Sequence, residues 1–214
     1  MAHDDLCKPT YLERCAAVLD GDPGAVSCHS LVRRIDSDGD LGEAYRRELN
    51  FNHPDPVIRF ARAMALDHGC VSVFGVIRLS ALVDTPRIAP FVGSDRPLLA
   101  DLALRGRLEH VDEELFLWRD HPKRSVKLLD RKTRQAWFDP NGKPLWSSLF
   151  VRQLLANQAA ALRVPPRALD RLRAFGSTWA WVLRSRKPLF RDFKAVLGAL
   201  LRQVTPARTS SRPS

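Results

Sequence analysis

The chain has 214 residues, of which 45% are hydrophobic and 27% are charged. This composition is ordinary for a globular protein, and the length suffices for one domain or for a domain with an appendage. No run approaches the roughly 20 apolar residues of a membrane span, and no apolar signal region opens the sequence, so it predicts a cytoplasmic protein. The four cysteines match no spacing typical of metal or redox sites.

The net charge of +10 is concentrated at the C-terminal end. Residues 163–214 contain twelve Lys or Arg and two Asp, whereas residues 1–162 are balanced. Three interpretations of this basic segment stay open: a helical hairpin with solvated arginines, an interfacial helix at 189–204 on anionic membrane, or a nucleic-acid site. Nucleic acid is the least favoured, because no recognised nucleic-acid module accompanies the charge.

The first third of the chain alternates predicted helices and strands. Apolar residues at helical spacing predict a helix that ends near Leu19 and another over 56–66. Short apolar runs predict strands at 25–35 and at 70–76. The polar stretch 42–54 is expected to be an irregular loop.

The stretch PFVGSDRPLLADLALRG, residues 90–106, predicts a short helix that starts near Asp95. Pro97 is tolerated in a first helical turn, apolar residues follow at helical spacing, and Gly106 ends the pattern. A carboxylate at this position commonly caps a helix, and the local pattern by itself favours that role for Asp95 or Ser94.

Strands, a basic loop and an aromatic patch are expected next. Residues 108–111 and 115–118 predict two strands on either side of three acidic residues, and a polar loop with a basic cluster, 119–125, follows them. An aromatic patch at Trp137 leads into a turn, and we expect Trp137, like Trp118, to be buried in the core.

The last third is predicted to be helical. Helices are expected at 145–162, 167–183 and 189–204. The composition of residues 205–214 is that of a disordered tail. The sequence therefore predicts an α/β domain over 1–144, a basic helical appendage over 145–204, and the tail.

Three blocks, in this order, resemble the second half of a bacterial glycosyltransferase family 2 enzyme, an inverting transferase of the GT-A fold. AHDDLCKPTYLERC, residues 2–15, resembles that family's motif for metal and nucleotide diphosphate. FGVIR and PFVGSDRPLLADLALRGR, residues 74–78 and 90–107, resemble the acceptor-side segment that holds the catalytic base. LFLWRDHPKRSV, residues 115–126, resembles the strand and loop that close the active site.

The resemblance implies an α/β fold of incomplete GT-A type with a C-terminal α-helical appendage. Enzymes of this family carry about one more αβ half before the acidic motif, and that half holds the base and ribose of the nucleotide. It is absent from this sequence, so we expect the chain to be truncated. An isolated partial sheet exposes an apolar edge, so poor solubility or inactivity is also expected.

Sugar transfer needs a base for the acceptor hydroxyl and positive charge for the departing diphosphate. The resemblance assigns Asp95 as the base and Asp5 to a divalent cation, Mg²⁺ or Mn²⁺. It places Asp4 on the metal or the donor sugar. His121 is a further candidate metal ligand, because imidazole suits transition metals, and its alternative role is that of a surface residue.

Three further residues are candidates for substrate binding. Arg124 and Ser125 can bind phosphate oxygens, or belong to a merely solvated basic loop. Arg96 adjoins Asp95 and can orient an acceptor or lower the pKa of the base.

The predicted function is transfer of a sugar from a nucleotide-sugar donor to the hydroxyl of a saccharide or lipid-linked acceptor, with inversion. Such a reaction belongs to cell-envelope or polysaccharide synthesis, at the inner face of the membrane if the basic helices contact lipid. The alternative is a non-catalytic fragment whose basic C-terminal helices bind anionic membrane or nucleic acid.

Overall fold

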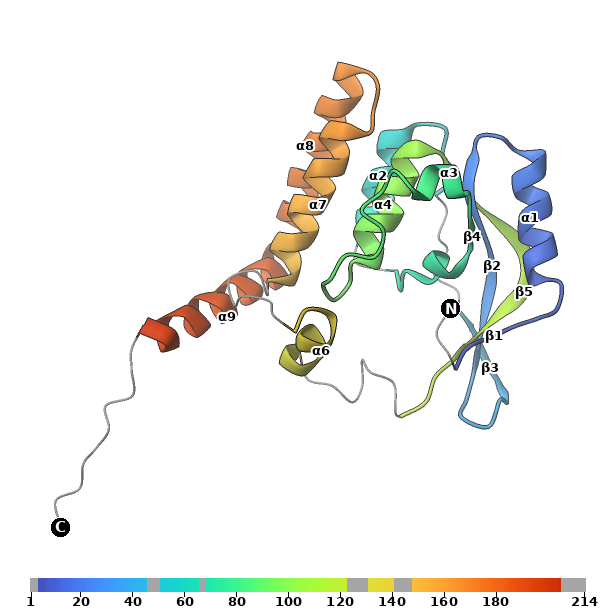
Figure 1. Ribbon diagram of the computed structural model, residues 1–214, viewed down its shortest axis with the longest axis horizontal. Helices are drawn as coiled ribbons and strands as arrows, with labels where there is room; N and C mark the ends of the chain where they lie inside the picture. The colour runs from blue at the N-terminus through green and yellow to red at the C-terminus, as the bar shows by residue number, and fades with distance from the viewer. Residues whose placement is uncertain (1–3, 46–50, 66–67, 123–130, 141–147, 205–214) are drawn as a thin grey trace, which may run out of the picture.

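The computed structural model describes residues 4–45, 51–65, 68–122, 131–140 and 148–204 (Figure 1). It is an α/β structure with one mixed sheet and helices packed on both sides of it. The predicted α/β class is therefore confirmed. The finer assignment to an incomplete GT-A fold stays a prediction, and the predicted tail 205–214 lies outside the described residues.

The sheet has the strand order β1-β5-β2-β3, and β4 also pairs with β2. β5 is parallel to β2 and antiparallel to β1, while β2 is antiparallel to β3 and to β4. The strands are β1 (Leu6–Cys7), β2 (Ala25–Ile35), β3 (Leu41–Tyr45), β4 (Val76–Ile77) and β5 (Arg107–Arg119). The central pair of long strands, β2 and β5, thus organises the sheet.

β5 is one strand where the sequence predicted two. Val111 pairs with Ser30, and the next pair is Glu114 with Leu31, so Asp112 and Glu113 have no partner in the register. Extra residues in one strand make a bulge, and both carboxylates are exposed there. The acidic residues that seemed to separate two strands therefore bend a single one.

The helices include those predicted in the first third of the chain. The structure has α1 (Tyr11–Gly21), α2 (Pro56–Met64), η1 (Val71–Phe74, a 3₁₀ helix), α3 (Leu79–Leu82), α4 (Asp95–Arg105), α6 (Arg131–Phe138), α7 (Leu149–Arg163), α8 (Ala168–Arg184) and α9 (Arg186–Val204). α2 begins where expected because Asp55 accepts a hydrogen bond from Val57 N at 2.8 Å and Pro56 occupies the first turn.

Three local predictions are wrong. Residues 71–74 form η1 instead of a strand, because Cys70 takes a left-handed conformation with φ of 57° and turns the chain. Residues 42–45 belong to β3, although the stretch 42–54 was predicted as an irregular loop. Trp137 belongs to α6, whose Arg, Lys, Gln and Ala residues favour a helix, and its side chain is 71% exposed instead of buried.

The core lies between the sheet and the helices on either side. Figure 1 shows α1 on one side of the sheet, α2 and α4 on the other, and α7 with α8 beyond them. Tyr11, Phe60, Leu99 and Phe116 are among the most buried members of one apolar cluster. Trp181 of α8 belongs to the same cluster, so the C-terminal helices pack on the α/β part.

α9 begins at Arg186, three residues before the predicted start of that helix at Leu189. Pro188 falls in its first turn, where the missing N–H is not needed. Within the residues that the structure describes, no helix is both long and apolar enough to cross a membrane.

Candidate functional site

The acidic pair Asp4-Asp5 lies beside the end of β5. Strand β1 follows the pair directly and pairs with the last residues of β5, Leu6 opposite Leu117. Asp5 is buried, and its Oδ1 accepts a hydrogen bond from the backbone N–H of Arg119 at 3.0 Å. The pairing of β1 with β5 therefore fixes the Asp5 carboxylate at one edge of the sheet.

His121 joins this group from the loop after β5. Its Nε2 lies 2.6 Å from Oδ2 of Asp4. The Arg119 side chain holds the surroundings in place, since it donates to the Asp4 carbonyl at 2.9 Å and to the carbonyls of Asp36 and Ser37 at 2.8 and 2.9 Å. Two segments far apart in the sequence thus meet.

Asp95 is the first residue of α4 and is half-buried. Its Oδ1 accepts a hydrogen bond from Arg96 N at 3.0 Å, and the Cys70 thiol forms a hydrogen bond with its carboxylate. Burial raises the pKa of Asp95 above its usual value, against the lowering effects of these hydrogen bonds and of the Arg96 charge. Burial likewise raises the pKa of Cys70 to about 12, so the thiol is protonated and can donate.

The N-terminus of α4 is not capped in the way that the sequence predicted. Ser94 occupies the N-cap position and makes no side-chain capping bond. The Asp95 carboxylate accepts from the N–H of the very next residue, whereas a capping side chain reaches the second or third N–H beyond it. The Asp95 carboxylate therefore does not act as a regular N-cap of α4.

The Arg96 side chain is directed at the chain that follows α2. Its guanidinium donates to the carbonyls of Ala65 and His68, the latter at 2.9 Å, and lies 2.8 Å from Nε2 of His68. These contacts tie the start of α4 to the segment around His68. Orientation of an acceptor by Arg96 stays a prediction.

Asp95 begins α4, and only Gly106 connects the end of that helix to the start of β5. Asp4, Asp5 and His121 lie near the other end of β5. In Figure 1, the start of α4 and the end of β5 both face the lower side. Arg124 and Ser125 lie outside the described residues.

The residues around Asp4 suit a divalent cation by their chemistry. Carboxylate oxygens are the ligands that Mg²⁺ and Mn²⁺ prefer, and His121 adds a nitrogen donor. In the described part of the chain, no three His, Cys, Asp or Glu side chains gather into a metal-holding group. A site for Mg²⁺ does not need such a group, since Mg²⁺ usually keeps several waters and binds one or two carboxylates plus substrate phosphates. Asp4 and Asp5 supply carboxylates of the type that such a site uses, and the Nε2 of His121 is engaged with Asp4.

Sequence reasoning missed three residues that shape these groups. His68 and Cys70 flank a glycine after α2, and this pattern indicates only a turn. Their contacts with Arg96 and Asp95 arise from the packing of α2 against α4. Arg119 was part of a predicted basic loop, but nothing in its spacing indicated that it would clamp the N-terminal segment.

Comparison with protein-family models, with curated proteins and with solved structures gives no match to this chain. The functional proposal therefore rests on the resemblance of the three sequence blocks together with the arrangement of these residues. A half-buried carboxylate with a raised pKa suits general base catalysis, and adjacent carboxylates with an imidazole suit a cation that neutralises phosphate.

Proposed function

We propose that the protein transfers a sugar from a nucleotide-diphosphate donor to a hydroxyl of a saccharide or lipid-linked acceptor, with inversion. In one displacement, the acceptor oxygen forms a bond to the anomeric carbon while the bond from that carbon to the diphosphate oxygen breaks. The diphosphate leaves with the electron pair, and the acceptor proton passes to the Asp95 carboxylate.

The observation that carries this proposal is the 2.6 Å contact between Asp4 and His121, beside the buried Asp5. The resemblance assigns the donor diphosphate to the acidic pair and to the loop after β5, and these segments are in contact. Mg²⁺ or Mn²⁺ bound by these side chains would stabilise the negative charge of the leaving diphosphate. Arg119 supports the geometry through its bonds to the backbone on both sides.

The environment of Asp95 supports its role as the base. A general base works best when its pKa is close to the working pH, and burial moves the pKa of Asp95 in that direction. The hydrogen bonds from Arg96 N and from the Cys70 thiol hold the carboxylate in a defined orientation. A positioned base of this kind typically accelerates a reaction by about 10²–10⁴-fold.

The test measures binding and turnover separately. The protein, or a longer form of it if this chain turns nothing over, is mixed with a panel of nucleotide sugars and Mg²⁺ or Mn²⁺, and release of nucleoside diphosphate is followed. Calorimetry measures the affinity for each nucleoside diphosphate with the metal. Asp95→Asn should lower the rate by about 10²–10⁴-fold and leave that affinity unchanged. Asp4→Asn and Asp5→Asn should weaken metal-dependent binding.

Asp20→Asn serves as the matched control, because Asp20 is an exposed carboxylate on α1. It should change neither quantity, and circular dichroism should show that all the variants are folded. Full rate and full affinity in both the Asp95 and the Asp5 variants would show that the site assignment is wrong.

A further inference from the structure

Helix α8 presents an apolar stripe to solvent. Its buried residues, Ala174, Thr178 and Trp181, face the core. On the opposite face, four apolar side chains that are 51–69% exposed recur at helical spacing: Leu169, Leu172, Trp179 and Leu183. A surface helix normally turns its apolar stripe inward and its polar face outward, so this second stripe requires an explanation.

The stripe continues onto α9. Only Ser185 separates the two helices, and its φ of −95° and ψ of 12° depart from helical values where the chain kinks, as Figure 1 shows. The bonds Ser185 N to Trp181 O (2.8 Å) and Leu189 N to Ser185 O (2.9 Å) join the two helices at this kink. Three apolar side chains on α9 are 46–61% exposed: Phe190, Phe193 and Leu197.

We call these seven side chains the apolar ridge. It follows about 40 Å of helix contour from Leu169 to Leu197. Cations accompany it along α9, where Lys194 Nζ lies 4.7 Å from the centre of the Phe190 ring. Lysine and arginine beside apolar residues are typical of helices that lie in a membrane interface, because their long side chains reach back to the polar layer.

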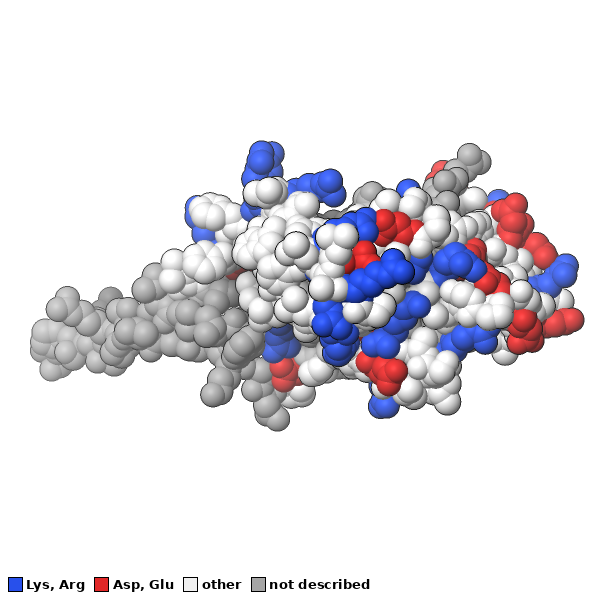
Figure 2. All heavy atoms as spheres, turned by 90° about the horizontal axis from the view of Figure 1, so that it is seen from above, with Lys and Arg blue, Asp and Glu red and all other residues white. Residues whose placement is uncertain are grey.

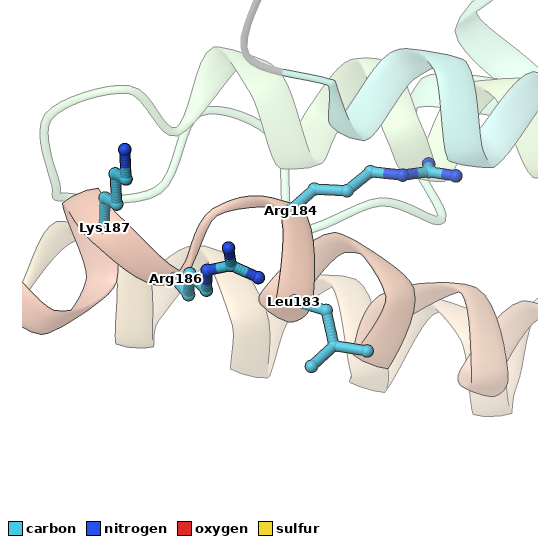
Figure 3. A pocket seen from close by; sticks show the side chains of 4 residues that line it. All are labelled: Leu183, Arg184, Arg186 and Lys187. Carbon is cyan, nitrogen blue, oxygen red and sulfur yellow. The ribbon is translucent and has the colours of Figure 1, made fainter.

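The junction of α8 and α9 carries three exposed cations. Arg184, Arg186 and Lys187 line a hollow of about 570 Å³ together with Leu183 of the ridge. Figure 3 shows Leu183 pointing to one side, while Arg184 and Lys187 extend to the other. At this junction the apolar side chain and the cations therefore point in opposite directions, as the apolar and polar sides of an interfacial helix do.

Carboxylates do little to neutralise this surface. Asp170 is paired with Arg173 at 3.0 Å, and Asp192 is buried and accepts hydrogen bonds from Ser148 Oγ and Phe150 N. These are the two acidic residues of the segment 163–214. In Figure 2, red spheres are more frequent toward the sheet end of the molecule than toward the C-terminal helices.

We propose that this face binds the surface of an anionic lipid bilayer, with the apolar ridge in the interfacial layer and Arg184, Arg186 and Lys187 on lipid phosphates. A symmetric contact between two copies would bring two positive faces together, which is repulsive. Nucleic acid would satisfy the cations but leave the leucines of the ridge in water. An anionic bilayer complements both the charge and the apolar side chains. This proposal rests on the exposed face and is independent of sugar transfer.

Flotation of the full chain with vesicles tests the proposal. The vesicles contain phosphatidylcholine with an equal amount of phosphatidylglycerol, or phosphatidylcholine alone. Binding to the anionic vesicles should be much the stronger, and it should weaken as salt rises from about 0.1 M to 1 M and the Debye length falls from about 10 Å to 3 Å. Each cation near an anionic surface contributes about a fivefold change, so replacing Arg184, Arg186 and Lys187 by Gln should weaken binding by on the order of a hundredfold. F190S/F193S should weaken it as well.

Matched variants at other positions test whether vesicle binding depends on this face or on nonspecific adsorption. Replacing Lys8, Arg14 and Arg87 by Gln removes the same charge from exposed positions outside α8 and α9, and L12S/L79S removes two equally exposed leucines. Both should bind like the unchanged protein.

Four results would overturn the proposal. The first is equal binding to neutral and anionic vesicles, and the second is unchanged binding by the variants at the junction and the ridge. The third is a lipid-free dimer that F190S/F193S dissociates, and the fourth is binding to duplex DNA that is tighter than binding to vesicles. Either of the last two would give the face another occupant.

Discussion

His29 lies in the middle of β2 and should make the protein lose stability as the pH falls. Its side chain is only 7% exposed, and it is paired in register with His110 on β5, the two ring centres being 5.9 Å apart. Burial, followed by the positive charge that His110 can carry, lowers the pKa of His29 from 6.5 to about 4. The folded protein therefore holds a neutral imidazole where the unfolded chain binds a proton.

The direction and size of the effect follow from these two pKa values. Between pH 6.5 and pH 4, the unfolded chain binds more protons than the folded one, so stability is complete above pH 6.5 and is lost progressively toward pH 4. The full decrease in the free energy of unfolding is about 3 kcal/mol, and about 2 kcal/mol of it occurs between pH 7 and pH 5. With a denaturant slope of about 2–3 kcal/mol per molar urea, that part should lower the unfolding midpoint by slightly less than 1 M.

Urea unfolding at pH 7 and pH 5 measures this loss. His29→Phe removes the titrating group and keeps an aromatic ring, so its loss between the two pH values should be smaller than that of the unchanged protein by about 2 kcal/mol. His110→Gln removes the exposed ring of the pair. The His110→Gln variant should still lose most of this stability between pH 7 and pH 5, because burial is the larger cause of the lowered pKa of His29. Equal losses in the unchanged protein and in His29→Phe would refute the reasoning.

Two further predictions concern stability. Asp101 is 2% exposed and lies between Arg105 at 2.7 Å and Arg163 at 2.5 Å. Asp101→Ala loses both charged hydrogen bonds and should lower the free energy of unfolding by about 3 kcal/mol. Arg163→Ala leaves Asp101 paired with Arg105 and should lower it by about 1 kcal/mol. Comparable losses in both variants, measured by urea unfolding, would contradict this asymmetry. A Cβ at Gly106 would lie 2.4 Å from Val26 Cγ1, so Gly106→Ala should lower the free energy of unfolding by about 1–3 kcal/mol. An unchanged melting curve would contradict this prediction, because it would show that the backbone at Gly106 can move away from β2 without cost.

The local elements were largely predictable. Helical spacing indicated α1, α2 and α4, and the apolar run 25–35 indicated β2, because a helix or a strand that buries one face repeats its own period in the sequence. The start of α4 at Asp95 was predicted from a glycine, a proline and the leucines that follow. Predictions failed where the backbone departs from a regular period, as at Cys70 and at the bulge in β5.

The sequence by itself also located the whole net positive charge in residues 163–214 and placed Asp4, Asp5, Asp95 and His121 among the candidate residues. Only the tertiary structure decided what these residues touch. The pairing of β1 with the end of β5 brings Asp4 to His121, and the packing of α2 against α4 brings Cys70 to Asp95. It also turned one apolar face of α8 outward and buried His29. The periodicity of apolar residues indicates which residues share a face of a helix or strand. Which other segment packs on that face depends on contacts between residues far apart in the chain, and these contacts produce no periodic pattern in the sequence.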